Sequence, residues 1–230
     1  MSFGYSHYPR RTSAFRAVVS GASVIWHCNY DTDLIHELST TDFSSVRNAA
    51  TPGVEPFGVG GTASVIWHCD FTDDLIYELS TTDFSTVRSS ASPGALPFGI
   101  GGDDDTIWHV DVISGLVYEL STTDFSVVRS DSNPAGGLRG IGGTASVIWH
   151  TNLVNFPTDV RIFELSTTDF STVRSSASPA GNPVGIGGTD NVIWHSDETS
   201  DLVYELSTTD FSVIRSAASP ATKVRDIGGS

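Results

Sequence analysis

The sequence predicts an all-β protein built from five repeated antiparallel units, and three observations support this prediction. Tryptophans recur at intervals of 41, 41, 41 and 45 residues, each in the same local context (Trp26, Trp67, Trp108, Trp149 and Trp194). Each repeat holds four short runs rich in β-branched and aromatic residues, a composition typical of strands. No window has the period of an amphipathic helix. Self-similarity of this length, with four strands per repeat, predicts the blades of a five-bladed β-propeller.

The second repeat illustrates the predicted order of its four strands. Strands are expected at 57–61, 64–69, 75–79 and 84–89, with polar turns at 70–74 and 80–83. Nearly continuous apolar runs suit blades that pack against neighbours on both faces. The glycines of 57–61 suit an innermost strand, where blades crowd around the axis. Trp67 and Phe84 are expected to fill the wider outer part of the blade.

The number of blades follows from the number of copies. Candidates for the first strand occur at 15–20, 57–61, 98–102, 139–143, 184–188 and 224–229, against five sets of the other three strands. We therefore expect a five-bladed ring, residues 15–230, that is closed by a strand from one end of the chain. Segment 224–229 fits the repeat better than 15–20, and pairing it with the first blade removes an exposed edge. The alternative is a larger ring assembled from two or more chains.

The repeat resembles a known class of propeller sequence. It reads P-x-G-I-G-G-x-x-S-x-I-W-H, followed by D-L-I-Y-E-L-S-x-x-D-F-S-x-V-R, and is similar to the NHL/YVTN/quinoprotein-like repeat over residues 15–229. The resemblance implies the fold alone. The constellations used by catalytic members of that class are absent from this sequence, so no catalytic residue is carried over.

Composition narrows the range of partners. The formal net charge is −15 and the isoelectric point is about 4.5, so phosphate backbones should repel the chain and nucleic acid is not an expected partner. No apolar run reaches the roughly 18 residues of a membrane span, and segment 1–14 lacks the apolar core of a secretory signal. We expect a short N-terminal tail, a cytoplasmic location and a monomer. Cys28 and Cys69, at equivalent positions of successive repeats, are expected to be free, partly buried thiols.

The most constant stretch is Glu-Leu-Ser-Thr-Thr-Asp-Phe-Ser, which is identical in all five repeats. Its aspartate is expected to hydrogen bond to the backbone of its own turn. This structural interpretation applies to Asp42, Asp83, Asp124, Asp169 and Asp210.

The candidate ligand-binding residues follow each tryptophan. Histidine comes directly after it, and an Asp or Asn stands two places further on. A closed ring would place these groups at one height, where imidazoles near carboxylates could bind a polar ligand or a metal. The alternative is a histidine that hydrogen bonds to the backbone or to the next blade, since second strands should lie too far apart to share one ion. We predict no metal or cofactor. The candidates are His27, His68, His109, His150, His195, Asn29, Asp70, Asp111, Asn152 and Asp197.

Asymmetry between the repeats is a second indicator of function. The fourth repeat has four extra residues within 150–161, which expose Leu153, Val154 and Phe156, so Phe156 joins the candidate ligand-binding residues as part of a contact patch. Neutral drift in a surface loop is the alternative. Asp103-Asp104-Asp105 and the acidic group at 70–74 are weak calcium candidates, because neither has the pattern of an EF-hand loop. No nucleophile elbow, phosphate loop or zincin motif is present.

Three functions remain open at this point. The first is a non-enzymatic scaffold that binds a protein or another ligand through its loop face. The second is a multivalent, lectin-like carbohydrate binder with one site per blade. The third is a hydrolase or lyase of the propeller class. Fold alone does not choose among them.

Overall fold

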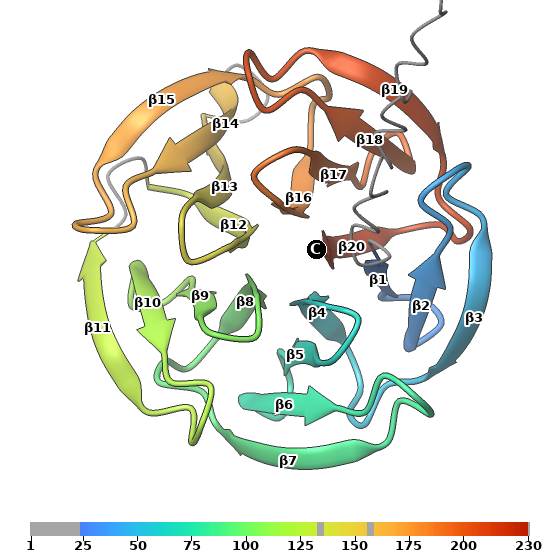
Figure 1. Ribbon diagram of the computed structural model, residues 1–230, viewed down its shortest axis with the longest axis vertical. Helices are drawn as coiled ribbons and strands as arrows, with labels where there is room; N and C mark the ends of the chain where they lie inside the picture. Colours follow the sequence, from blue (N-terminus) through green and yellow to red (C-terminus); the bar gives the residue numbers. More distant parts are fainter. Residues whose placement is uncertain (1–23, 133–135, 156–158, 230) are drawn as a thin grey trace, which may run out of the picture.

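The protein is a ring of five antiparallel sheets around a central axis (Figure 1). The computed structural model describes residues 24–132, 136–155 and 159–229. All the regular secondary structure within these residues is β-strand. Each sheet has four strands, and the innermost strand of every sheet lies nearest the axis. The predicted five-bladed β-propeller is therefore confirmed.

The blades are numbered here in chain order from the first tryptophan. Blade 1 contains β20 (Val224–Gly229), β1 (Ile25–Asn29), β2 (Leu34–Leu38) and β3 (Ser45–Ala50). Blade 2 contains β4 (Pro56–Gly61), β5 (Ile66–Asp70), β6 (Leu75–Leu79) and β7 (Thr86–Ala91). Blade 3 contains β8 (Pro97–Gly102), β9 (Ile107–Asp111), β10 (Leu116–Leu120) and β11 (Val127–Ser132). Blade 4 contains β12 (Leu138–Gly143), β13 (Ile148–Asn155), β14 (Asp159–Leu165) and β15 (Thr172–Ala177). Blade 5 contains β16 (Pro183–Gly188), β17 (Ile193–Asp197), β18 (Leu202–Leu206) and β19 (Val213–Ala218).

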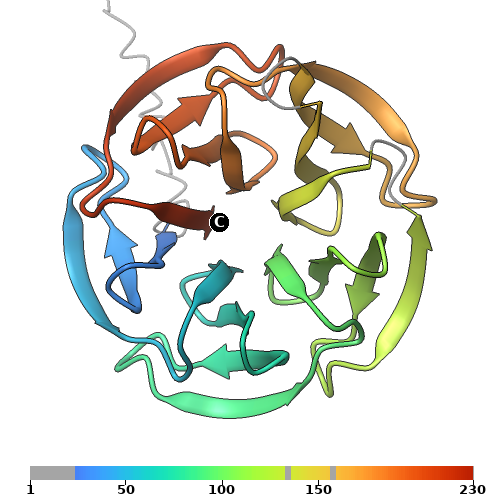
Figure 2. The same ribbon diagram turned by 180° about the vertical axis from the view of Figure 1, so that it is seen from behind.

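Strand β20 closes the ring from the C-terminal end. It pairs antiparallel with β1, with Gly228 opposite Trp26 and Ile227 opposite His27, and both ribbon views show it between β1 and the axis (Figures 1 and 2). This confirms 224–229 as a closing strand; the other candidate, 15–20, lies outside the described residues. A single chain completes five blades, so the structure is not a larger ring shared between chains.

Glycine allows the five innermost strands to meet at the axis. A Cβ atom placed on Gly60 would lie 2.6 Å from the Cα of Gly101, and Gly101, Gly142, Gly187 and Gly228 continue the same contact around the ring, back to Gly60. Contacts this short leave no room for a side chain, which explains the first glycine of the Gly-Gly pair in each innermost strand.

The outer part of each blade differs from the prediction in one detail. The fourth strand of blade 2 begins at Thr86 rather than Phe84, because Phe84 belongs to the turn with a φ of +61°. Its equivalents Phe43, Phe125, Phe170 and Phe211 also have positive φ. Burial of the ring selects phenylalanine here, although this backbone conformation disfavours most side chains.

The extra residues of the fourth repeat lengthen a hairpin. Strands β13 and β14 have eight and seven residues, where their equivalents in the other blades have five. Leu153 is half-buried at this extension, whereas Phe156 lies outside the described residues.

Candidate functional site

The five repeated histidines lie inside the blades rather than around a common cavity. Each is completely buried on the second strand of its blade. Nδ1 of His109 lies 2.9 Å from the carbonyl oxygen of Gly99 on the innermost strand, and the other four make the equivalent contact at 2.8–3.0 Å. Serine hydroxyls complete the environment of three rings: Ser219 lies 3.1 Å from Nε2 of His27, Ser92 3.1 Å from that of His109 and Ser178 3.2 Å from that of His195.

Burial also removes the positive charge that a histidine could otherwise carry. It lowers the pKa of His27 to about 3 and the pKa of each of the other four to about 4. These rings are therefore neutral at ordinary pH. Within the described residues, no group of three or more His, Cys, Asp or Glu side chains is arranged to hold a metal ion.

The Asp and Asn residues two places after each histidine cap turns. Oδ1 of Asp111 accepts a hydrogen bond from the backbone N–H of Ser114 (2.6 Å), and Oδ2 accepts one from Leu96 in the connection between blades (2.6 Å). Asp197 binds Ser200 and Asn182 in the same way. Asn29 and Asn152 also accept backbone hydrogen bonds through Oδ1. This arrangement favours a structural role, and ligand binding by these residues stays a prediction.

Asp70 departs from this pattern. Its Oδ1 accepts backbone hydrogen bonds from Thr72 and Asp73, but its Oδ2 has no partner among the described residues. In blade 2 the residue equivalent to Leu96 and Asn182 is Glu55, and its N–H donates to Oδ1 of Asp33 instead of to Asp70. Burial raises the pKa of Asp70 to about 6.

The identical Glu-Leu-Ser-Thr-Thr-Asp-Phe-Ser stretch joins each blade to its neighbour. Nε of Arg129 in blade 3 donates to Glu119 on the adjacent strand (2.5 Å), and its Nη atoms donate to the carbonyl oxygens of Thr167 and Thr168 in blade 4. The guanidinium also lies 4.4 Å from the ring centre of Phe170, which packs edge-on against Trp108. We call this set the clasp.

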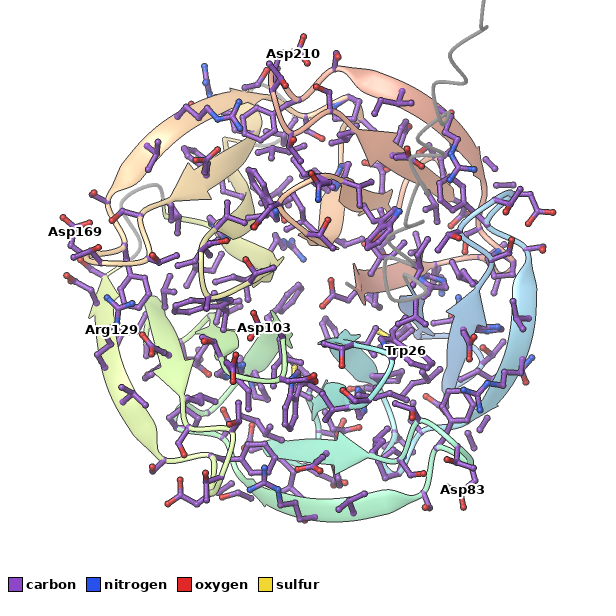
Figure 3. The ribbon with its side chains drawn as sticks, in the orientation of Figure 1. Trp26, Asp83, Asp103, Arg129, Asp169 and Asp210 are labelled. Carbon is purple, nitrogen blue, oxygen red and sulfur yellow. The ribbon has the colours of Figure 1, made fainter. Side chains whose placement is uncertain are left out.

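The clasp repeats around the whole ring. Arg47, Arg88, Arg174 and Arg215 make the same contacts, and Arg215 reaches Thr40 and Thr41 across the junction between blades 5 and 1. In each copy, the aspartate accepts hydrogen bonds from the N–H and hydroxyl of the serine two places later, as for Asp83 and Ser85. The expected turn is confirmed, and Figure 3 shows Asp83, Asp169 and Asp210 at the periphery of the ring.

Asp103 and Asp104 also connect neighbouring blades. Oδ1 of Asp104 accepts hydrogen bonds from the hydroxyls of Thr62 and Ser64 in blade 2, and Oδ2 of Asp103 accepts one from the N–H of Ala145 in blade 4. Asp103 lies closer to the axis than the clasp aspartates (Figure 3). The two cysteines are free, as expected, but completely rather than partly buried, and burial raises the pKa of both thiols.

Asymmetry is concentrated where the innermost strands begin, on the face that carries the connections between blades. We call this the loop face. The position that is Phe57 in blade 2 is Phe98, Arg139, Val184 and Arg225 in the other blades. The ring centres of Phe57 and Phe98 lie 4.6 Å apart. The guanidinium carbon of Arg139 lies over the Phe98 ring, 4.8 Å from its centre, and that of Arg225 lies over the Phe57 ring at 4.9 Å. We call these five residues the axial cluster.

The two arginines of the axial cluster share one acidic neighbour. Glu198 lies 2.7 Å from Nη1 of Arg225 and influences Arg139 only at longer range. Burial lowers the pKa of Arg139, with Arg225 contributing to the decrease and Glu198 opposing it. The axial cluster therefore carries an excess positive charge in a protein whose net charge is −15.

A pocket of about 250 Å³ lies against Arg139. Phe98, Val112, Leu138 and Leu153 supply most of its apolar wall. Leu153 stands at the start of the lengthened hairpin of blade 4. The pocket thus combines two departures from the repeat, the arginine on β12 and the extension of β13.

Deeper along the axis, one carboxylate occupies a place where the other blades have glycine. Asp226 corresponds to Gly58, Gly99, Gly140 and Gly185, and it is 1% exposed. It accepts hydrogen bonds from the N–H groups of Val59 (3.0 Å) and Ile227 (2.8 Å), and those of Ile100 and Ile186 also favour its charged form. Burial outweighs these groups and raises the pKa of Asp226 well above its usual value.

The axial cluster was not among the predicted site residues, although the sequence contains a signal for it. The residues after it on each innermost strand are nearly constant, whereas this one position varies between aromatic, aliphatic and cationic side chains. His109 and Asp111 stand at positions that the repeats share, whereas Arg139 stands at a position where the repeats differ.

Comparison with known proteins places the fold in context. No protein-family model matches the chain, and no curated protein matches it in sequence. Among solved structures, a nidogen/laminin complex is similar over 90% of this chain and 98% of the other, at 11% identity and a TM-score of 0.61. A Myxococcus xanthus glutaminyl cyclase is similar over 75% of this chain and 69% of its own, at 12% identity and a TM-score of 0.56. A streptogramin B lyase is similar over 90% of this chain and 68% of its own, at 18% identity and a TM-score of 0.53.

The five sheets of the ring define the class of protein as a five-bladed β-propeller with repeated blades, and these similarities agree with a propeller fold. At such low identity they bear on the fold alone, and the similar structures include two enzymes and a complex between proteins. No described helix is long and apolar enough to cross a membrane.

Proposed function

We propose that this protein is a non-enzymatic binding propeller that recognises its ligand on the loop face, at the pocket beside Arg139. The observation that supports this most directly is the state of Arg139: it is the one described arginine without a carboxylate in ion-pair range. A partly buried cation without an ion-pair partner costs stability. Such a group is therefore a reasonable candidate for a binding residue.

The distribution of polar groups supports the same face. On the opposite face, the clasps bind their own turn and the neighbouring blade, so most of their hydrogen-bonding capacity is already used. The loop face carries the unequal residues of the axial cluster and the pocket beside Arg139. We also assign the repeats to the NHL/YVTN/quinoprotein-like class, on the sequence pattern and the likeness of the fold.

The lectin-like alternative has less support. It needs an equivalent accessible platform in each blade, whereas the five tryptophans are at most 2% exposed and the histidines are completely buried. Catalysis likewise has no specific support, because the axial cluster provides neither a nucleophile nor a paired acid and base.

A ligand-observed NMR screen of small-metabolite mixtures, followed by amide shift mapping of each hit, tests the proposal. We expect shifts at Val112, Leu138 and Leu153 on the loop face, and little change at Thr123 and Asp124 on the opposite face. Equal shifts in all five blades would favour the lectin-like alternative. Chemical turnover of a mixture component would favour an enzyme.

A further inference from the structure

We infer that the pocket beside Arg139 binds a small monocarboxylate whose other end is apolar, with one site per chain. This inference rests on the proposed function and specifies its ligand. Three features of the site support it: the charge of Arg139, the ion pair that Glu198 already makes with Arg225, and the size and lining of the pocket.

The guanidinium of Arg139 has donors available for an oxyanion. Seven of the eight described arginines have a carboxylate within 4.0 Å, and Arg139 is the exception. It is half-buried. Its guanidinium carbon lies over the ring of Phe98, 4.8 Å from the ring centre, a contact that does not use the N–H groups. A carboxylate matches this planar fork with two parallel hydrogen bonds.

The remaining charges nearby favour an anion from outside the protein. Glu198, the acidic group that acts on Arg139, is bound to Arg225 at 2.7 Å and to the side chain of Asn182 at 3.1 Å. Arg225 adds a second positive charge beside Arg139. A bound carboxylate would neutralise this excess, and partial exclusion of water would strengthen the interaction.

The lining of the pocket determines the chemistry of the part of the ligand that lies away from Arg139. The aromatic ring of Phe98 and the aliphatic side chains of Leu138, Leu153 and Val112 form an apolar wall. The volume of about 250 Å³ is below the roughly 300–1,000 Å³ of drug-sized sites. A ligand with one ring or a short alkyl chain is therefore favoured over an oligosaccharide or a peptide.

Only one blade can provide this site. The equivalents of Arg139 in blades 2, 3 and 5 are Phe57, Phe98 and Val184, which carry no charge. Arg225 in blade 1 is already paired with Glu198 and lies over the rings of Tyr30 and Phe57. The stoichiometry is thus one per chain, in contrast to the five of a lectin-like propeller.

Benzoate, its neutral isostere benzamide and the small anion acetate are suitable probes. Each is titrated into the wild-type protein and the variants Arg139→Gln and Arg161→Gln by NMR at low salt. Arg161 is a matched control, because it is an arginine of the same blade whose pair with Asp159 lies on an exposed surface. We expect benzoate to bind with a Kd of about 1 mM, with shifts at Leu138 and Leu153. Benzamide and acetate should bind at least about tenfold more weakly.

The variants separate this inference from the proposed function. Arg139→Gln should weaken benzoate binding by at least about tenfold, whereas Arg161→Gln should leave it within about twofold. Equal binding of benzoate to wild type and Arg139→Gln, or no shift at about 10 mM benzoate, would overturn the inference. A screening hit that maps to the loop face but is unaffected by Arg139→Gln would also overturn it, while leaving the proposed function intact. Failure of every hit to map to the loop face would contradict both.

Discussion

At the scale of single residues, the structure separates side chains that maintain the fold from those available to a ligand. His109 is typical of the first group, because it is buried and bound to the backbone of its own blade. Arg139 belongs to the second group, since it is half-buried and has no ion-pair partner among the described residues. The same kind of reasoning gives two predictions about pH.

The five buried histidines should remain neutral well below pH 6. Their folded pKa values of about 3 to 4 lie below the usual value of about 6.5, so protonation favours the unfolded state. Each histidine then contributes a loss of stability, on the order of 3 kcal/mol, as pH falls from about 6.5 to about 4. Histidine ¹⁵N shifts recorded from pH 7 to pH 5 check this. A histidine at one of these five positions that titrates near pH 6.5 in the folded protein would contradict the prediction.

Asp226 should contribute a pH dependence of the opposite sign. Its pKa is raised by burial, so the stability linked to its protonated form is present at low pH and is lost as pH rises through the raised value. Asp226→Asn cannot titrate. In urea unfolding, the variant should therefore become more stable relative to wild type as pH rises above about 4. A constant difference across that range would show that Asp226 does not control it.

At the scale of elements, the clasp explains why eight residues are identical in every repeat. Arg129 contacts a glutamate on its own sheet, two carbonyl groups and a phenylalanine ring. The turn of the next blade supplies both carbonyl groups and the phenylalanine. Each copy of the stretch is therefore constrained by contacts within its own blade and with the preceding one.

Loss of one clasp should cost more than loss of an exposed ion pair. Arg129→Gln removes the pair with Glu119, the bonds to two carbonyl groups and the stacking on Phe170, and should destabilise the protein by about 1–2 kcal/mol. Arg161→Gln, whose pair is 42% and 49% exposed, should cost less than about 1 kcal/mol. Urea unfolding of both variants checks the difference. Equal losses would mean that the clasp adds little.

The same elements show how far sequence reasoning reaches. The strand pattern predicts the fold because each run must bury its side chains between two blades, and the aspartate turn follows from local chemistry alone. The left-handed conformation of Phe84 could not be predicted in this way, because it depends on burial beside Trp26 of the preceding blade. The axial cluster was missed for a related reason: Phe98 and Arg139 lie 41 residues apart in the chain and become neighbours only when the innermost strands converge.

At the scale of the whole molecule, the ring is closed twice. On the inside, β20 completes the sheet of blade 1; on the outside, Arg215 of blade 5 reaches the turn of blade 1. Both closures join parts of the chain that are more than 170 residues apart. The five blades should therefore unfold as one cooperative unit, unlike an open array of repeats.

Removal of residues 224–230 tests this cooperativity. The deletion exposes β1, takes away the completely buried Val224 and Ile227, and should cost at least about 3 kcal/mol. We expect a broad, early thermal transition by circular dichroism, or dimers on size-exclusion chromatography that exchange their strands. A single sharp transition at the wild-type temperature would show that β20 is dispensable for closure.

The position of β20 also has a consequence for synthesis on the ribosome. Strands β1, β2 and β3 are translated before the other described strands, and the fourth strand of their sheet, β20, is translated after them all. Blade 1 must wait, with one edge unpaired, for some 180 residues that at typical elongation rates take about 10–40 s to add. During this interval the nearly identical innermost strands of blades 2 to 5 emerge one after another, and each could compete for the edge of β1. Asp226, which only β20 carries, gives the last strand a contact with Val59 that its competitors do not have.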